Sequence, residues 1–144
     1  MTENSSTPMA TLHVVLSYRD APGALRWLEK AFGFETTLEA PDDKGGLMHA
    51  EVRYGTGVAF TLFTDEAGYD RPTRKGETAG SGMYISVGSE ETVDALYASA
   101  TTAGAESIWA PEATEWGNYR FRVVDPEGYE WTFGTHVPGQ PQSW

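Results

Sequence analysis

In the first half of the chain, apolar residues recur first at every second position, then at every third or fourth position, and then at every second position again. Residues 12–18 alternate, which predicts a strand. Asp20 is a favourable N-cap and Gly33 a favourable left-handed C-terminal residue, so a helix is predicted between them. Its apolar face consists of Ala21, Ala24, Leu25, Leu28, Ala31 and Phe32. Three further strands, separated by glycine-containing turns, are predicted at residues 34–39, 47–54 and 57–64.

The same βαβββ order recurs in the second half. Residues 82–87 predict a strand, and Ser89 begins a helix that ends before Gly104. Three more strands are predicted at residues 105–109, 119–124 and 129–135. A constant shift places Ala24 on Ala95 and Gly33 on Gly104, so the chain is predicted to contain one unit twice.

This repeat predicts one domain with two βαβββ modules. The predicted segments are a disordered arm (1–10), a first module (11–64), a polar linker (65–80), a second module (81–136) and an extended tail (137–144).

Charge and composition exclude several classes of protein. The 21 acidic and 10 basic residues give a net charge of −11, which argues against nucleic acid and anionic membranes as partners. The lack of cysteine excludes disulfides, thiolate metal sites and a cysteine nucleophile. The sequence carries neither a membrane-length apolar run nor a signal-peptide pattern, so we expect a cytoplasmic protein.

Two segments carry a resemblance to a known family: TLHVVLSYRDAPGALRWLEKAFGFE (11–35) and FRVVDPEGYEWTFGTH (121–136). They resemble the vicinal oxygen chelate superfamily, which includes glyoxalase I, extradiol dioxygenases, fosfomycin-resistance enzymes and bleomycin-resistance proteins. The resemblance implies an α+β fold in which two βαβββ modules form a cup-shaped mixed sheet, with the helices outside and the ligand inside. In the second segment, Pro126 and Gly128 favour a tight turn, so Asp125 is predicted to be a turn residue rather than a catalytic acid.

The resemblance also indicates where metal-using members place their ligands. The four positions fall at His13, near Thr61, near Gly82 and at Thr132. Only His13 is an ordinary metal ligand, so no metal or other cofactor is expected. A rearranged metal site of His13, Glu51 and Glu130 remains an alternative.

Other interpretations of these polar residues are simpler. His49 and Glu51 share one face of their strand, so they are also expected to lie on the solvent side or to form a polar pair. His136 follows the last strand and is expected at the surface.

Alternation within the strands predicts which side chains face the ligand. Tyr129, Trp131 and Phe133 share a face suited to the core, and Leu12 is expected under the helix in the same way. The candidate ligand-binding residues are His13, Thr61, Trp116, Arg122, Glu130 and Thr132.

The segment 110–118 and the strand after it offer further candidates. Trp116 is equally consistent with stacking on a ligand and with packing, whereas Trp109 is favoured as a core residue. Arg120 and Arg122 alternate on one strand, where they could contact an anionic ligand or pair with Glu130 and Asp125.

We therefore expect a protein that binds a small organic molecule without a metal, in the manner of the bleomycin-resistance branch. A cationic or aromatic ligand would suit the acidic chain. The alternative is a lyase, isomerase or dioxygenase acting on a small carbonyl or phenolic compound, with His13 as the best candidate base. The resemblance also implies a homodimer.

Overall fold

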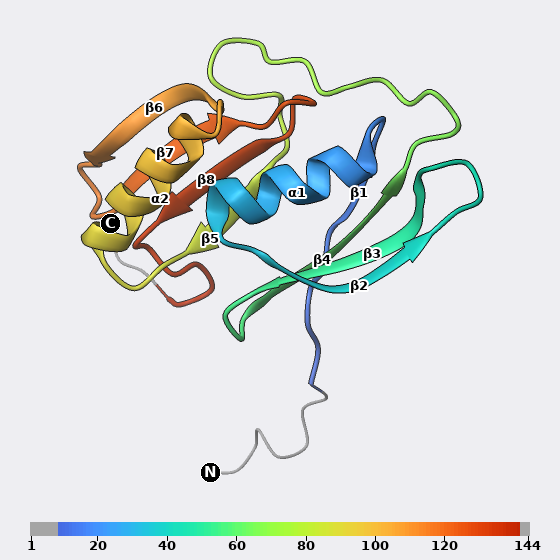
Figure 1. Ribbon diagram of the computed structural model, residues 1–144. Helices are drawn as coiled ribbons and strands as arrows, with labels where there is room; N and C mark the ends of the chain where they lie inside the picture. Colours follow the sequence, from blue (N-terminus) through green and yellow to red (C-terminus); the bar gives the residue numbers. More distant parts are fainter. Residues whose placement is uncertain (1–8, 142–144) are drawn as a thin grey trace.

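Two helices and two four-stranded sheets make up residues 9–141, the part of the chain that the computed structural model describes (Figure 1). The first module forms β1 (Val15–Tyr18), α1 (Ala21–Phe32), β2 (Glu35–Pro41), β3 (Leu47–Tyr54) and β4 (Val58–Thr64). The second forms β5 (Met83–Ser86), α2 (Glu90–Thr102), β6 (Glu106–Ala113), β7 (Tyr119–Val124) and β8 (Glu130–Gly134). The strand orders are β1-β4-β3-β2 and β5-β8-β7-β6, which confirms the predicted α+β fold with two βαβββ units.

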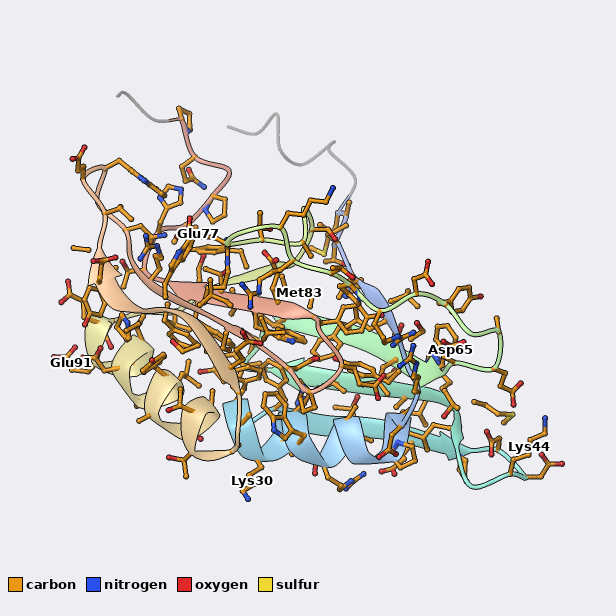
Figure 2. The ribbon with its side chains drawn as sticks, turned by 90° about the horizontal axis from the view of Figure 1, so that it is seen from above. Lys30, Lys44, Asp65, Glu77, Met83 and Glu91 are labelled. Atoms are coloured by element: carbon orange, nitrogen blue, oxygen red, sulfur yellow. The ribbon has the colours of Figure 1, made fainter. Side chains whose placement is uncertain are left out.

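The helices cover one face of the sheets and leave the other face open. Figure 2 shows both helices along one side, while the labelled Glu77, in the connection between β4 and β5, lies on the opposite side. We call this opposite side the open face. Among residues 9–141, neither helix is long and apolar enough to cross a membrane.

The helix ends follow the sequence signals. Asp20 Oδ1 accepts a hydrogen bond from the Gly23 backbone N–H (3.0 Å), which satisfies one of the free donors in the first turn of α1. Gly33 ends α1 in the left-handed region at φ 73°. Ser89 Oγ caps α2 by accepting from the Thr92 N–H (3.1 Å). These predictions are confirmed.

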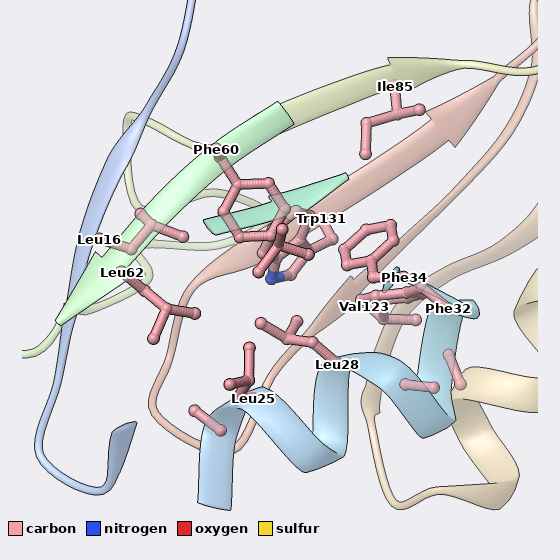
Figure 3. Close-up of a cluster of buried hydrophobic side chains, with 14 of the residues drawn as sticks. Leu16, Leu25, Leu28, Phe32, Phe34, Phe60, Leu62, Ile85, Val123 and Trp131 are labelled. Carbon is pink, nitrogen blue, oxygen red and sulfur yellow. The ribbon is translucent and has the colours of Figure 1, made fainter. Parts of the chain in front are cut away.

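Aromatic packing joins the two modules (Figure 3). Phe32, at the end of α1, has its ring centroid 5.5 Å from that of Trp131 and 4.9 Å from that of Phe133 in β8. Phe60 of β4 approaches Trp131 at 5.4 Å. Trp131 has no exposed surface, which confirms its prediction as a core residue.

A buried carboxylate also links the modules. Asp125, only 5% exposed, accepts hydrogen bonds from the Tyr18 hydroxyl (2.6 Å) and from Trp131 Nε1 (3.1 Å). Its carbonyl accepts from the Gly128 N–H (3.0 Å), so the segment is the predicted turn. Burial raises the pKa of Asp125, although the hydrogen bond from Tyr18 acts in the opposite direction.

Glu127 strengthens the same junction from the turn. Its two carboxylate oxygens accept from the backbone N–H groups of Arg19 (2.6 Å) and Asp20 (2.8 Å), just before α1. It also pairs with Arg71 across 3.1 Å, and both side chains are largely buried. The second module therefore holds the start of the first helix directly.

Some predicted boundaries are wrong. The first strand begins at Val15 rather than at residue 12, and Leu12 is 96% exposed instead of packing under the helix. The strand predicted at 105–109 extends to Ala113. Of the predicted arm and tail, residues 1–8 and 142–144 lie outside the described part of the chain.

Candidate functional site

Polar side chains gather on the open face of the second sheet. The strand register pairs Arg120 with Gly134 and Arg122 with Thr132, and β5 adds Tyr84 beside Thr132. Paired residues point to the same side of a sheet, so these residues face away from the helices. They bring a phenol, a hydroxyl and two guanidinium groups to one surface.

This surface is the floor of a pocket of about 390 Å³, within the usual size range of small-molecule sites. Trp109, Trp116 and His136 form its sides. Gly134 allows Asn118 and Tyr84 to approach the strand closely, because a Cβ atom there would lie 2.6 Å from both Asn118 Oδ1 and the Tyr84 hydroxyl. The pocket combines aromatic walls with hydrogen-bonding groups.

Trp109 stacks with two arginines. The guanidinium carbons of Arg120 and Arg122 lie 4.1 and 4.0 Å from its ring centroid. Both guanidinium groups therefore lie within cation–π distance of the indole. The indole N–H donates to Glu77 Oε2 (2.7 Å). The prediction that Trp109 packs into the core is wrong, because the indole lies on the open face and orders the arginines.

Residues 74–80, which we call the strap, cross the open face beside this stack. Glu130, only 5% exposed, points to the strap and accepts from the Ala79 N–H (2.7 Å) and from Thr78 Oγ1 (3.0 Å). The Glu77 carbonyl accepts from Arg122 Nη1 (2.9 Å). Glu130 thus fastens the strap to the sheet and is already engaged by donors of the protein.

The two arginines differ in their surroundings. Arg122 donates from Nε to Thr132 Oγ1 (2.8 Å) and lies 3.6 Å from Glu130 Oε2. Arg120 Nη1 is hidden from solvent and has no hydrogen-bond partner among the described residues. Its guanidinium lies 3.6 Å from the exposed carboxylate of Glu112. Arg120 is therefore the less compensated cation.

The turn at 114–118 presents Trp116 at the rim of the pocket. The turn is fixed by Thr114 Oγ1, which accepts from the Asn118 N–H (2.9 Å), and by Gly117, whose φ of 101° suits glycine. Trp116 is 48% exposed and meets the His136 ring edge to face at 5.0 Å. Asn118 Oδ1 accepts from the His136 N–H (3.0 Å), so the turn and the segment after β8 are held together. His136 is part of the site rather than a simple surface residue.

Comparison with known proteins agrees with this architecture. A family model described as the Glyoxalase/Bleomycin resistance protein/Dioxygenase superfamily matches residues 11–133. The chain belongs to this superfamily. The predicted resemblance to the vicinal oxygen chelate superfamily is thereby confirmed.

Superfamily relatives cover most of the chain. Uncharacterised proteins of Mycobacterium bovis and Mycobacterium tuberculosis are 30% identical over 136 residues, which is 90% of this chain and 84% and 75% of theirs. The crystal structure of TioX from a Micromonospora species is 26% identical, with a TM-score of 0.66 over 90% of this chain and all of that one. Glyoxalase I from Zea mays, at 17% identity and a TM-score of 0.68, covers 88% of this chain and 44% of its own, and shows the fold alone.

The metal positions of the superfamily do not form a metal site here. His13 Nδ1 donates to the Ala59 carbonyl (2.7 Å), and its Nε2 lies 2.7 Å from Thr11 Oγ1. Gly82 has no space for a ligand, because its Cβ would lie 2.2 Å from Glu130 Cγ. Within residues 9–141, no three histidine or carboxylate side chains gather in a way that could hold a metal ion. The side chains at the four superfamily positions therefore do not fit a metal ion.

The alternative metal site of His13, Glu51 and Glu130 does not form either. Glu51 pairs with His49 at 2.8 Å, as one of the simpler interpretations predicted, and Glu130 is bound to the strap. His13 lies in a different cleft, lined by the segment before β1 and by β4 and β5, and Thr61 lies on the first sheet. Of the six predicted ligand-binding residues, Trp116, Arg122 and Thr132 meet in one pocket.

Several residues of the pocket were missing from the sequence-based candidates, among them Trp109, which was assigned to the core, and His136, which was assigned to the surface. Tyr84 and Asn118 gave no signal in the sequence. Arg120 was noted only as an alternative contact for an anion, although its alternation with Arg122 places it on the same face. That alternation was the signal that could have included it.

Proposed function

We propose that the protein binds a small planar organic molecule in the pocket of the second sheet, without a metal and without changing it chemically. The observation that carries this proposal is the arrangement of Trp116, His136 and Tyr84 around a pocket of about 390 Å³. Aromatic side chains with a few hydrogen-bonding groups are typical of sites for small organic ligands.

Trp116 is the side chain best suited to contact the ligand. The ring of Trp109 is already stacked with two guanidinium groups, whereas Trp116 is 48% exposed at the rim. A planar ligand that stacks on an indole gains about 0.5–1.5 kcal/mol beyond the burial of its area. The hydroxyl of Tyr84 and that of Thr132 lie on the floor, where they can orient polar groups of the ligand.

Binding can be tested by tryptophan fluorescence, with a panel of two-ring aromatic compounds titrated into the full chain. We expect at least one compound to quench the emission saturably, and Trp116→Ala to weaken its binding about 2- to 12-fold, since stacking contributes about 0.5–1.5 kcal/mol. The melting temperature should change little, because the side chain is half exposed.

Tyr69→Ala is the matched control, because Tyr69 is 53% exposed and lies outside this pocket. It should leave binding unchanged. Mass spectrometry should recover the bound compound intact, and elemental analysis should find no stoichiometric transition metal. Equal binding by wild type and Trp116→Ala, or conversion of the compound, would contradict the proposal.

A further inference from the structure

The second module concentrates its positive charge in one place. After Lys75, the sequence contains no lysine or arginine other than Arg120 and Arg122. Both lie on the open face of β7 and line the pocket. Arg120 and Arg122 are the only arginine, lysine or carboxylate side chains among the described residues that line the pocket, although the whole chain has a net charge of −11.

The charge of Arg122 is already balanced by the protein. Its guanidinium lies 3.6 Å from the buried carboxylate of Glu130 and donates to Thr132 Oγ1 and to the Glu77 carbonyl. Glu130 is in turn held by the strap. This pair needs no further anion.

The charge of Arg120 is not balanced in the same way. Its side chain is only 15% exposed, and Nη1 lacks a hydrogen-bond partner among the described residues. Its acidic neighbour, Glu112, lies at 3.6 Å and is 69% exposed, so water screens that interaction. A largely buried guanidinium without a hydrogen-bonded carboxylate is energetically unfavourable, and a ligand anion would relieve it.

The aromatic surroundings also disfavour a cationic ligand. Arg120 and Arg122 already lie over the ring of Trp109, a surface that would otherwise attract a cation. A ligand cation in the pocket would approach Arg120 instead. The nearby carboxylates of Glu112 and Glu115 are exposed, so salt screens any attraction between them and a ligand cation.

We infer that the ligand is a planar aromatic acid, whose carboxylate pairs with the guanidinium of Arg120 while its ring lies against Trp116. This inference rests on the proposed function and adds the charge class of the ligand. It differs from the cationic ligand that the net charge of the chain suggests. Arginine suits this role because its planar fork matches the two oxygens of a carboxylate.

Three probes of one shape separate charge from stacking: 2-naphthoate, 2-naphthamide and 2-naphthylmethylammonium. Their affinities for the full chain can be measured by isothermal titration calorimetry at low salt. We expect the carboxylate to bind at least about tenfold more tightly than the amide, which corresponds to about 1.4 kcal/mol, and the ammonium to bind most weakly.

Variants then assign the preference to one residue. Arg120→Gln should reduce the preference for the carboxylate over the amide to less than about threefold. Arg53→Gln is the matched control, because it removes the same charge from an exposed arginine on the first sheet and should leave the preference intact. Glu112→Gln removes the competing carboxylate and should tighten carboxylate binding about two- to threefold, with no effect on the amide.

The outcomes separate this inference from the proposed function. Equal binding of the carboxylate and the amide, or an unchanged preference in Arg120→Gln, would overturn the inference while leaving a planar ligand in place. If Arg120→Gln does not fold, an unchanged carboxylate affinity in the exposed variant Glu112→Gln would overturn it. If none of the three probes binds, the inference fails together with the site.

Discussion

The hydrogen bond from Tyr18 to Asp125 can be removed without disturbing the packing around it. Tyr18 is 1% exposed, and its hydroxyl donates across 2.6 Å from the first module to a carboxylate of the second. Tyr18→Phe keeps the ring and deletes only the donor. Asp125 retains three donors, which are Trp131 Nε1 and the N–H groups of Glu127 and Tyr129.

The magnitude follows from the charge and burial of the acceptor. Hydrogen bonds to charged groups contribute about 1.5–3 kcal/mol, and the remaining donors limit the loss, so we expect a cost of about 2 kcal/mol. For a chain of this length, a change of 1 kcal/mol shifts the melting temperature by about 4 °C, which predicts a decrease of about 8 °C.

The cost should depend on pH in one direction. Burial raises the pKa of Asp125 above its unfolded value, so its contribution to stability is fully present below the unfolded pKa and is lost as pH rises through the folded pKa. The Tyr18 hydroxyl lowers the folded pKa, and deleting it raises that pKa further. Tyr18→Phe should therefore be most destabilising at neutral pH and less so as Asp125 becomes protonated.

Thermal and urea unfolding, followed by circular dichroism over a range of pH, measures this cost. The control is Tyr129→Phe, which deletes a hydroxyl that donates to the neutral Ser17 carbonyl at the same junction (2.8 Å). It should cost about 1 kcal/mol at every acidic to neutral pH. If Tyr18→Phe costs no more than the control, or the same at all pH values, the argument for an ionised acceptor is refuted.

Three further predictions concern the pocket, the module junction and assembly. Gly134→Ala should lower the melting temperature and weaken binding of the planar probes together, because its Cβ would lie 2.6 Å from the Tyr84 hydroxyl; unchanged binding would contradict this. Glu127→Gln should lower the free energy of unfolding in urea by about 2 kcal/mol by breaking the pair with Arg71, and a loss below about 0.5 kcal/mol would refute that role. Light scattering should give the mass of a homodimer, since β1, β2, β5 and β6 lie at the ends of their sheets and pair on one side only within residues 9–141; a monomer mass would exclude it.

Local signals in the sequence were sufficient for the elements and for much of the core. The two ends of α1, at Asp20 and Gly33, could be predicted because helix capping depends on residues that are close together in the sequence. Trp131 was placed in the core by strict alternation along β8, which contains no irregularity. The meeting of Arg122 with Thr132 follows from the pairing of two regular strands.

Other features depended on irregular backbone. Shifts of register on both sides of Trp109 interrupt the alternation of β6, so periodicity could not predict the face on which the indole lies. Glu130 accepts hydrogen bonds from the strap, and this could not be predicted because the residues of the strap have no periodic pattern. His13 precedes β1, and an alternation rule does not apply where pairing has not begun.

The walls and the floor of the pocket have different tolerance for mutation. Its floor belongs to paired strands, where a substitution such as that of Gly134 disturbs neighbours on two other elements. Two of its sides come from the turn that carries Trp116 and from the segment after β8 that carries His136, both of which are connecting segments. Natural variation can therefore change the ligand by substitutions in these segments while the sheets are retained, and directed evolution of new binding should begin with libraries at residues 114–117 and 136–138.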